Sequence, residues 1–160
     1  MIQTAFEAEQ EYIDTRLRDV DPAVFEKWKH QLPATLAKRA NYFMTEFSRV
    51  NEALEAYRQG DIEKLGAVMF ASGLSSTQEW ESGCPEMIAL YNIMTETSGI
   101  YGGRFSGAGF KGCCRTISDP SKRESILSSV SQRYLEQFPE LKGQYSAHVC
   151  KTADGARKIG

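Results

Sequence analysis

Three glycines have the spacing that most directly suggests chemistry. Gly107, Gly109 and Gly112 lie in the segment "SGAGFKGCC" and match the pattern G-x-G-x-x-G. In dinucleotide-binding folds this pattern follows a strand and opens a helix, whose amino terminus holds the phosphates. Here the glycines precede "CCRTIS", which is typical of a strand. We therefore expect no dinucleotide site. Two interpretations stay open: a loop whose backbone approaches an anion closely, or a tight turn without a ligand.

The other reactive side chains lack partners at a suitable spacing. The four cysteines form neither a C-x-x-C pair nor a paired Cys/His metal set, and we expect free, buried thiols at Cys84, Cys113, Cys114 and Cys150. His30 and His148 have no neighbouring nucleophile or ligand pattern. Glu79 and Glu81 could form a general acid and base, but they stand in a polar connection. We expect structural roles for these four residues.

Length and charge limit the class of protein. A chain of 160 residues suits one domain with one core. The net charge is −2 and the basic residues are scattered, so nucleic acid is not an expected partner. No apolar run is long enough to span a membrane, and the amino terminus is acidic and amphipathic rather than like a signal peptide. We expect a cytoplasmic protein.

Helical periodicity dominates the first half of the chain. A long helix is predicted to begin just after Pro33, to end at Gly60, and to be followed by a second helix capped by Asp61. Apolar residues recur along the first helix at alternating spacings of four and three: Leu36, Ala40, Phe43, Phe47, Val50, Leu54 and Tyr57. This stripe is typical of one buried helix face. We expect the chain to bury it.

The second half predicts strands and helices in the order β-β-α-β. A helix begins at Pro85. Two strands, "IYGGRFS" and "CCRTIS", flank the glycine loop, and Asp119 with Pro120 opens a helix that continues to about Phe138. The alternating segment "YSAHVCKT" predicts a last strand. Together the elements predict an α+β fold, in which helices cover one face of an antiparallel sheet after an amino-terminal helical segment.

Several motifs, in the correct order, resemble one family. The segment "GIYGGRFSGAGFKGCC" resembles the third conserved motif of the GHMP small-molecule kinases in its galactokinase form. "SGCPEMIALYNI" resembles the galactokinase "SCPELD" segment, and "TADGARKI" resembles the "DGA" ending. "ASGLSS" and "RFSGAGFKGCC" are most similar to the galacturonokinase branch. The resemblance runs from about residue 23 to residue 159.

This resemblance implies a ferredoxin-like GHMP kinase carboxy-terminal domain over residues 1–160, with residues 1–33 as a helical lead-in. Family kinases transfer the γ-phosphoryl group of ATP, with Mg²⁺, to a sugar; here the implied acceptor is the anomeric hydroxyl of galacturonate or galactose. The motif loop facing the sugar and phosphate corresponds to Ser106, Gly107, Ala108 and Gly109. A cationic contact to a uronate carboxylate is implied for Lys111 and Arg104.

The resemblance also implies what this chain does not supply. The family's ATP phosphate loop and catalytic Asp belong to an amino-terminal domain, and "GLSS" at 73–76 lacks the second loop glycine and follows a helix. We expect no catalytic residue and no metal ligand here. ATP and Mg²⁺ would be bound mainly by an amino-terminal kinase half, in cis or in trans. Without that half, an exposed sheet edge and apolar patch would favour self-association. The alternative function is a non-catalytic sugar-binding or regulatory module, and a third possibility is a purely structural interaction domain.

Overall fold

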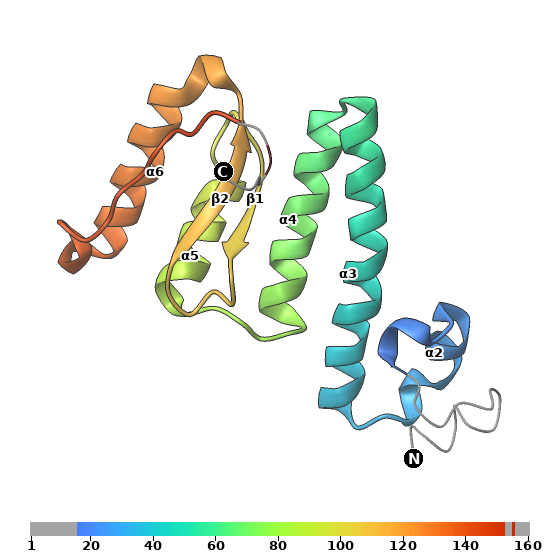
Figure 1. The fold of residues 1–160 in the computed structure, drawn as a ribbon. Coiled ribbons are helices and arrows are strands. Elements are labelled where there is room, and N and C mark those ends of the chain that lie inside the picture. The colour runs from blue at the N-terminus through green and yellow to red at the C-terminus, as the bar shows by residue number, and fades with distance from the viewer. Residues whose placement is uncertain (1–15, 153–154, 156–160) are drawn as a thin grey trace, which may run out of the picture.

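A computed structural model describes residues 16–152 and residue 155 (Figure 1). The described chain is an α+β structure, as predicted. In chain order its elements are η1 Leu17–Asp19, α2 Pro22–Trp28, η2 Lys29–Gln31, α3 Ala34–Gln59, α4 Ile62–Gln78, α5 Pro85–Thr95, β1 Ile100–Ser106, β2 Cys113–Ser118, η3 Pro120–Lys122, α6 Arg123–Gln137 and η4 Pro139–Leu141. The helical lead-in is confirmed from residue 16 onward; its first fifteen residues and the "DGA" ending lie largely outside the described residues.

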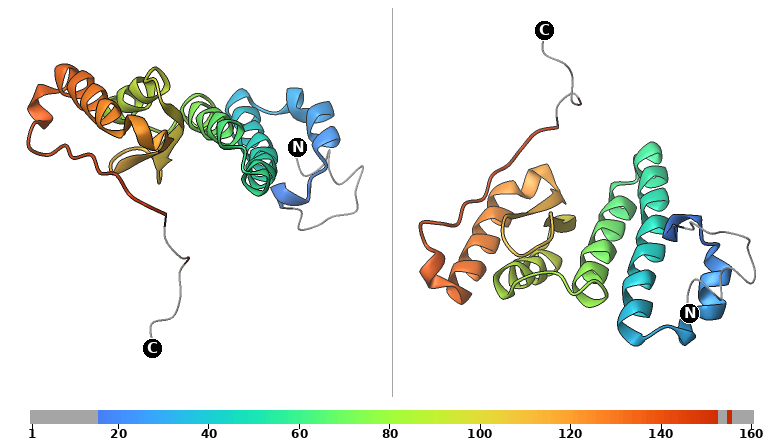
Figure 2. Two further views of the ribbon diagram at one scale, coloured as in Figure 1. Left: turned by 90° about the horizontal axis from the view of Figure 1, so that it is seen from above. Right: turned by 60° about the horizontal axis from the view of Figure 1, so that its bottom comes forward.

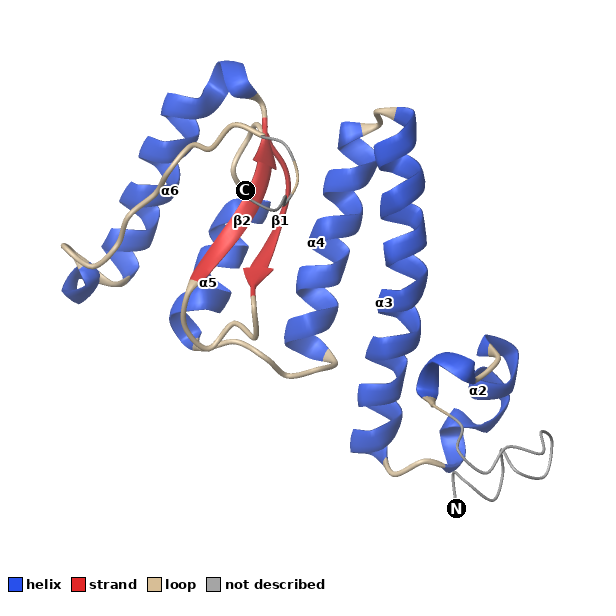
Figure 3. Cartoon of the chain, viewed as in Figure 1, coloured by secondary structure: helices blue, strands red, loops and turns tan. Residues whose placement is uncertain are grey.

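Helices α3 and α4 form an antiparallel pair, and their ends follow the predicted signals (Figure 3). Gly60 adopts a φ of +70°, which places the turn in the left-handed region that favours glycine. The Asp61 side chain then accepts a hydrogen bond from the Lys64 amide at 2.9 Å and caps α4. Local sequence chemistry therefore determines where this hairpin turns.

The apolar stripe of α3 is not buried as predicted. Leu36, Phe47, Val50, Leu54 and Tyr57 are all exposed. The helix turns another side toward α4, where it buries Ala56 and forms polar contacts. Small and hydrogen-bonded residues thus make the helix pair, and these five larger apolar residues stay exposed in the described part of the chain. The prediction that this chain buries its own stripe is wrong.

Strands β1 and β2 pair antiparallel, with Ser106 opposite Cys113. Helix α5 packs on this pair through a buried cluster of Met87, Tyr91, Met94 and Phe105. A second cluster joins α5 to α6 through Ile93, Ile126, Val130 and Tyr134. Seen from above, the elements follow one another across the molecule, from α3 through α4 and the strands to α6 (Figure 2). Helix α5 therefore supplies most of the buried cluster at β1, and α4 packs on the same strand.

The predicted last strand does not form. Residues 145–152 have no regular secondary structure, and His148 and Val149 are exposed. Instead, the ring of Tyr145 packs against Tyr134 of α6 at a centroid distance of 5.1 Å, and its hydroxyl lies 3.2 Å from that of Ser131. Contacts with α6 thus hold the start of this segment, while its alternating residues pair with no strand in the described chain. No helix in that described part has the length and apolar character needed to cross a bilayer.

Candidate functional site: the glycine-rich loop

The glycine pattern lies in the loop that joins β1 to β2. Gly107, Gly109 and Gly112 have φ values of +94°, +80° and +112°. These conformations strongly favour glycine because a Cβ atom would crowd the backbone. Strand β2 begins directly after Gly112, at Cys113. The prediction that a strand rather than a helix follows the glycines is confirmed, and the arrangement is not that of a dinucleotide fingerprint.

One side of the loop is anchored at Gly109. A Cβ added at Gly109 would lie 2.5 Å from the ring of Phe105, which is only 2% exposed. The carbonyl of Gly109 accepts a hydrogen bond from the amide of Cys84 at 3.0 Å, at the start of α5. At Gly109 the loop therefore packs against the buried Phe105 ring, and a hydrogen bond joins it to the amino-terminal end of α5. Only a glycine fits this contact without displacing the aromatic ring.

The other side of the loop is open. Gly107, Ala108 and Lys111 are exposed, and a Cβ at Gly107 would meet no atom within 4 Å. The amides of residues 107–111 donate no backbone hydrogen bond within the described part of the chain. Successive free amides in a glycine-rich bend form a concave site of partial positive charge that suits a phosphate or carboxylate oxygen. Ser106, at the end of β1, is half-buried beside this bend.

Arg104 already has partners inside the chain. Its Nη1 donates to Glu46 Oε1 of α3 at 2.8 Å and to Ser72 Oγ of α4 at 2.5 Å. Ser72 also donates to Glu46 at 2.5 Å, and Arg49 Nε donates to the second oxygen of Glu46 at 2.9 Å. This network joins α3, α4 and β1. A substrate contact from Arg104 stays a prediction, whereas Lys111 extends from the exposed loop itself.

Sequence reasoning missed Glu46 and Ser72, which hold Arg104. The available signal was the pair Glu46 and Arg49, spaced i and i+3 on α3 away from the apolar stripe. Such a pair usually indicates a solvated helix face. Here it marks the side that packs on α4, and only the fold brings Ser72 and Arg104 to it.

Acid is expected to weaken this network. Burial raises the pKa of Glu46, but hydrogen bonds from Ser72, Arg49 and Arg104 and the Arg104 charge outweigh it, so the pKa lies below its ordinary value of 4.5. A carboxylate with a lowered folded pKa stabilises the fold above its unfolded pKa, and this contribution is lost as the pH falls through the folded value.

We therefore expect Glu46→Gln to lower the free energy of unfolding by about 1–2 kcal/mol at neutral pH, because the Arg104 partner is only partly exposed. The difference from the unsubstituted chain should narrow as the pH falls below 4.5. Urea unfolding monitored by circular dichroism at several pH values measures the loss in the free energy of unfolding and its dependence on pH. Glu52→Gln, at an exposed position of the same helix, is the control and should change little. A Glu46 variant with unchanged acid sensitivity would contradict the assignment.

All four cysteines are free thiols, as predicted, but only Cys84 and Cys114 are partly buried; Cys113 and Cys150 are exposed, so their predicted burial is wrong. Burial, with smaller effects of Cys113 and Cys84, raises the pKa of Cys114 to about 12. This thiol is therefore unreactive at neutral pH. The described residues contain no group of three His, Cys, Asp or Glu side chains placed to hold a metal ion.

The two glutamates of the α4–α5 connection serve as structural links. Glu79 accepts hydrogen bonds from Asn41 at 2.6 Å and Ser75 at 2.7 Å. Glu81 pairs with Lys38 at 2.7 Å and with Arg39. Both carboxylates therefore tie the connection to the first turns of α3. This use agrees with the structural role predicted for them.

Comparisons with known proteins agree on one family. Residues 51–136 match the family described as GHMP kinases C terminal. The chain is 40% identical over 151 residues to the galacturonokinase of Arabidopsis thaliana, a match that covers 92% of this chain and 36% of that protein. The fold is similar to a galactokinase of Lactococcus lactis solved in complex with galactose, with a TM-score of 0.75, 24% identity, and coverage of 86% of this chain and 36% of that one. The chain thus spans about a third of each relative.

Proposed function

Since the chain belongs to the GHMP kinases and corresponds to their carboxy-terminal domain in a galactokinase-like form, we propose that it forms one wall of the active-site cleft of an ATP-dependent sugar kinase. The proposed reaction transfers the γ-phosphoryl group of ATP to the anomeric hydroxyl of galacturonate or galactose. The observation that carries this proposal is the open side of the β1–β2 loop, where the amides of residues 107–111 are free of backbone partners.

The loop would act through its backbone. Phosphoryl transfer needs little covalent chemistry from the protein, and catalysis depends on positioning and on stabilising the charge of the transferred group. The amides of the exposed residues Gly107 and Ala108 can offer N–H groups to a phosphate or sugar oxygen. The contacts of Gly109 with Phe105 and Cys84 would keep these groups in place before substrate binds. Such preorganisation avoids reordering of the loop during the reaction.

The residues of this chain fit only part of the family's cofactor chemistry. The free loop amides suit phosphate oxygens of ATP, which supplies the phosphoryl group when bound. Mg²⁺ requires oxygen ligands, and the described residues provide no cluster of carboxylates for it. As the family resemblance implies, we propose that an amino-terminal kinase half supplies the site of the metal ion, most of the nucleotide contacts and the catalytic base.

Reconstitution tests the proposal. The 160-residue chain is mixed with the portion of the Arabidopsis galacturonokinase that precedes its match to this chain, and ATP turnover is measured with galacturonate and with galactose. We expect turnover from the mixture and none from either part alone. A complex that binds sugar but never consumes ATP would favour the non-catalytic binding module instead.

Lys111 is proposed to favour a uronate substrate. It is exposed on the loop, and an ammonium beside the substrate carboxylate contributes up to about 1 kcal/mol at such a site. In the reconstituted kinase, Lys111→Gly should reduce kcat/KM for galacturonate about fivefold relative to galactose. Lys142→Gly, another exposed lysine outside the loop, should leave the ratio unchanged. An unaltered ratio in the Lys111 variant would remove this residue from substrate selection.

A further inference from the structure

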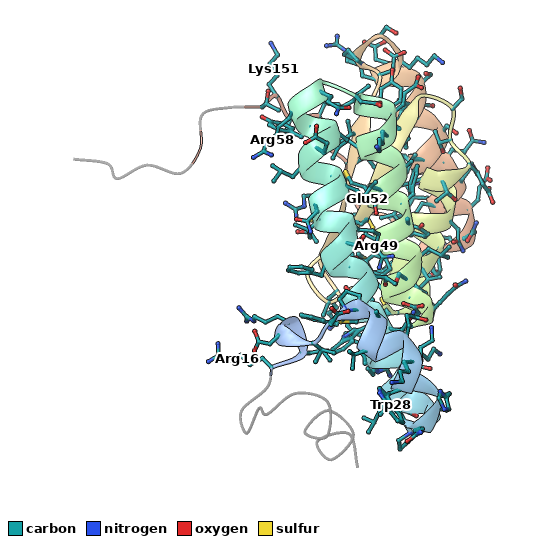
Figure 4. All side chains as sticks on the ribbon, turned by 90° about the vertical axis from the view of Figure 1, so that its right-hand side faces the viewer. Arg16, Trp28, Arg49, Glu52, Arg58 and Lys151 are labelled. Atoms are coloured by element: carbon teal, nitrogen blue, oxygen red, sulfur yellow. The ribbon has the colours of Figure 1, made fainter. Side chains whose placement is uncertain are left out.

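The outer side of α3 exposes four large apolar residues in one row. Phe47, Val50, Leu54 and Tyr57 are 58%, 59%, 46% and 73% exposed, and we call them the outer stripe. Their spacing of three, four and three residues is that of a helix face that packs lengthwise on another helix. Figure 4, seen from the side of the molecule on which α3 lies, labels Arg58 near the carboxy-terminal end of α3.

The fold itself leaves the outer stripe uncovered. Helix α3 meets α4 with a different side, which contains the buried Ala56 and the Glu46 contact to Ser72. The short helical elements of residues 17–31 lie beside the amino-terminal half of α3 only (Figure 1). Phe43, earlier in the same apolar row, is half-buried, and its ring stacks on that of Phe47 at a centroid distance of 6.5 Å. Beyond Phe43 the apolar residues of the row stay exposed in the described part of the chain.

An exposed row of this kind usually marks an interface. Isolated apolar residues are common on protein surfaces, but contiguous ones are rare unless a partner covers them. Here the polar side of α3 faces inward and the apolar side faces outward. The apolar side chains contribute little favourable free energy while they stay in contact with water. A partner helix would bury all four of them and so stabilise a complex.

We propose that the outer stripe is the docking surface for the amino-terminal half of the kinase. This inference rests on the proposed function. The chain spans 36% of each of two longer relatives, and its family match is to a carboxy-terminal domain. Most of each relative therefore lies outside the match, and it includes the half that must meet this domain to close a shared cleft. A half that contacts both α3 and the β1–β2 loop must extend past α4, which lies between them (Figure 1).

Binding measurements with matched variants test the surface. The 160-residue chain is titrated with the preceding portion of the Arabidopsis galacturonokinase by isothermal calorimetry, without nucleotide or sugar. Leu54→Glu should weaken binding at least about tenfold, because it places a charge in the buried interface. Leu74→Glu is the control: this leucine lies on α4 with the same 46% exposure, and its substitution should change Kd less than about twofold. Circular dichroism melts should show both variants folded, since both positions face solvent.

Each outcome decides the inference separately from the proposed function. Equal binding by Leu54→Glu and the unsubstituted chain would overturn the docking surface, as would no binding at all. A chain that sediments as a dimer, is made monomeric by Leu54→Glu and ignores the amino-terminal half would assign the stripe to a second copy and also overturn it. A complex that needs Leu54 but transfers no phosphoryl group would refute the proposed function alone. Turnover that survives Leu54→Glu with unchanged binding would refute the docking surface alone.

Discussion

Gly66→Ala is expected to destabilise the domain by about 3 kcal/mol or more, although alanine is the better helix former. Gly66 lies in α4, and a Cβ there would be 2.1 Å from the carbonyl oxygen of Tyr101 in β1. Across the same contact, a Cβ on Gly102 would lie 2.2 Å from the oxygen of Gly66. Both obstacles are backbone, so the helix and strand must separate. Overpacking against a rigid neighbour costs about 1–3 kcal/mol, and occasionally more.

The sign of the change in the free energy of unfolding shows whether steric overlap with β1 or helix propensity dominates at Gly66. Helix propensity alone predicts that Gly66→Ala stabilises the protein by about 1 kcal/mol. Urea unfolding measures the change, and Ala67→Gly at the next, exposed position provides the control. That control should lose about 1 kcal/mol or less, from propensity only. A Gly66 variant as stable as the unsubstituted chain would mean that α4 and β1 do not approach as closely as described.

The contrast with the α3–α4 hairpin shows which features the sequence could predict. Both ends of α3 and the start of α4 depend on Pro33, Gly60 and Asp61, whose effects act on adjacent residues. The glycine loop is similar, because its turn conformations depend on glycines within it. These features were predicted correctly since each is determined by a few neighbouring residues. The close approach of Gly66 to Gly102 has no such local signal, because either glycine alone resembles an ordinary helix or strand residue.

Two predictions failed because they required the identity of a distant partner. Periodicity correctly showed that α3 has an apolar face, but it could not show whether that face packs within the chain. The same limit applies to residues 145–152, whose alternation suits a strand only when a sheet edge is available to pair with it. Tyr145 instead packs on α6. The partners of Arg104 were not predicted for the same reason, since Glu46 lies 58 residues away in the sequence; its contact with a substrate stays a prediction.

Gly109→Ala is expected to reduce kcat/KM of the reconstituted kinase about 100-fold, comparable to the loss of one donor in an oxyanion site. Two effects combine at this position. A φ of +80° costs an alanine about 1–2 kcal/mol, and its Cβ would lie 2.5 Å from the buried Phe105 ring. Relief of this contact must lift the loop from the core and move the amides of Gly107 and Ala108 away from the substrate.

A graded series distinguishes loop geometry from general instability. Gly107→Ala has a similar backbone strain, at a φ of +94°, but its Cβ meets nothing within 4 Å, so its loss of activity should be smaller than that of Gly109→Ala. Gly143→Ala has the same two properties, at a φ of +98°, and lies outside the loop. It should reduce stability with little change in kcat/KM. Equal losses in all three variants would mean that the loop acts only through stability, because strain is common to them whereas position beside the substrate is not.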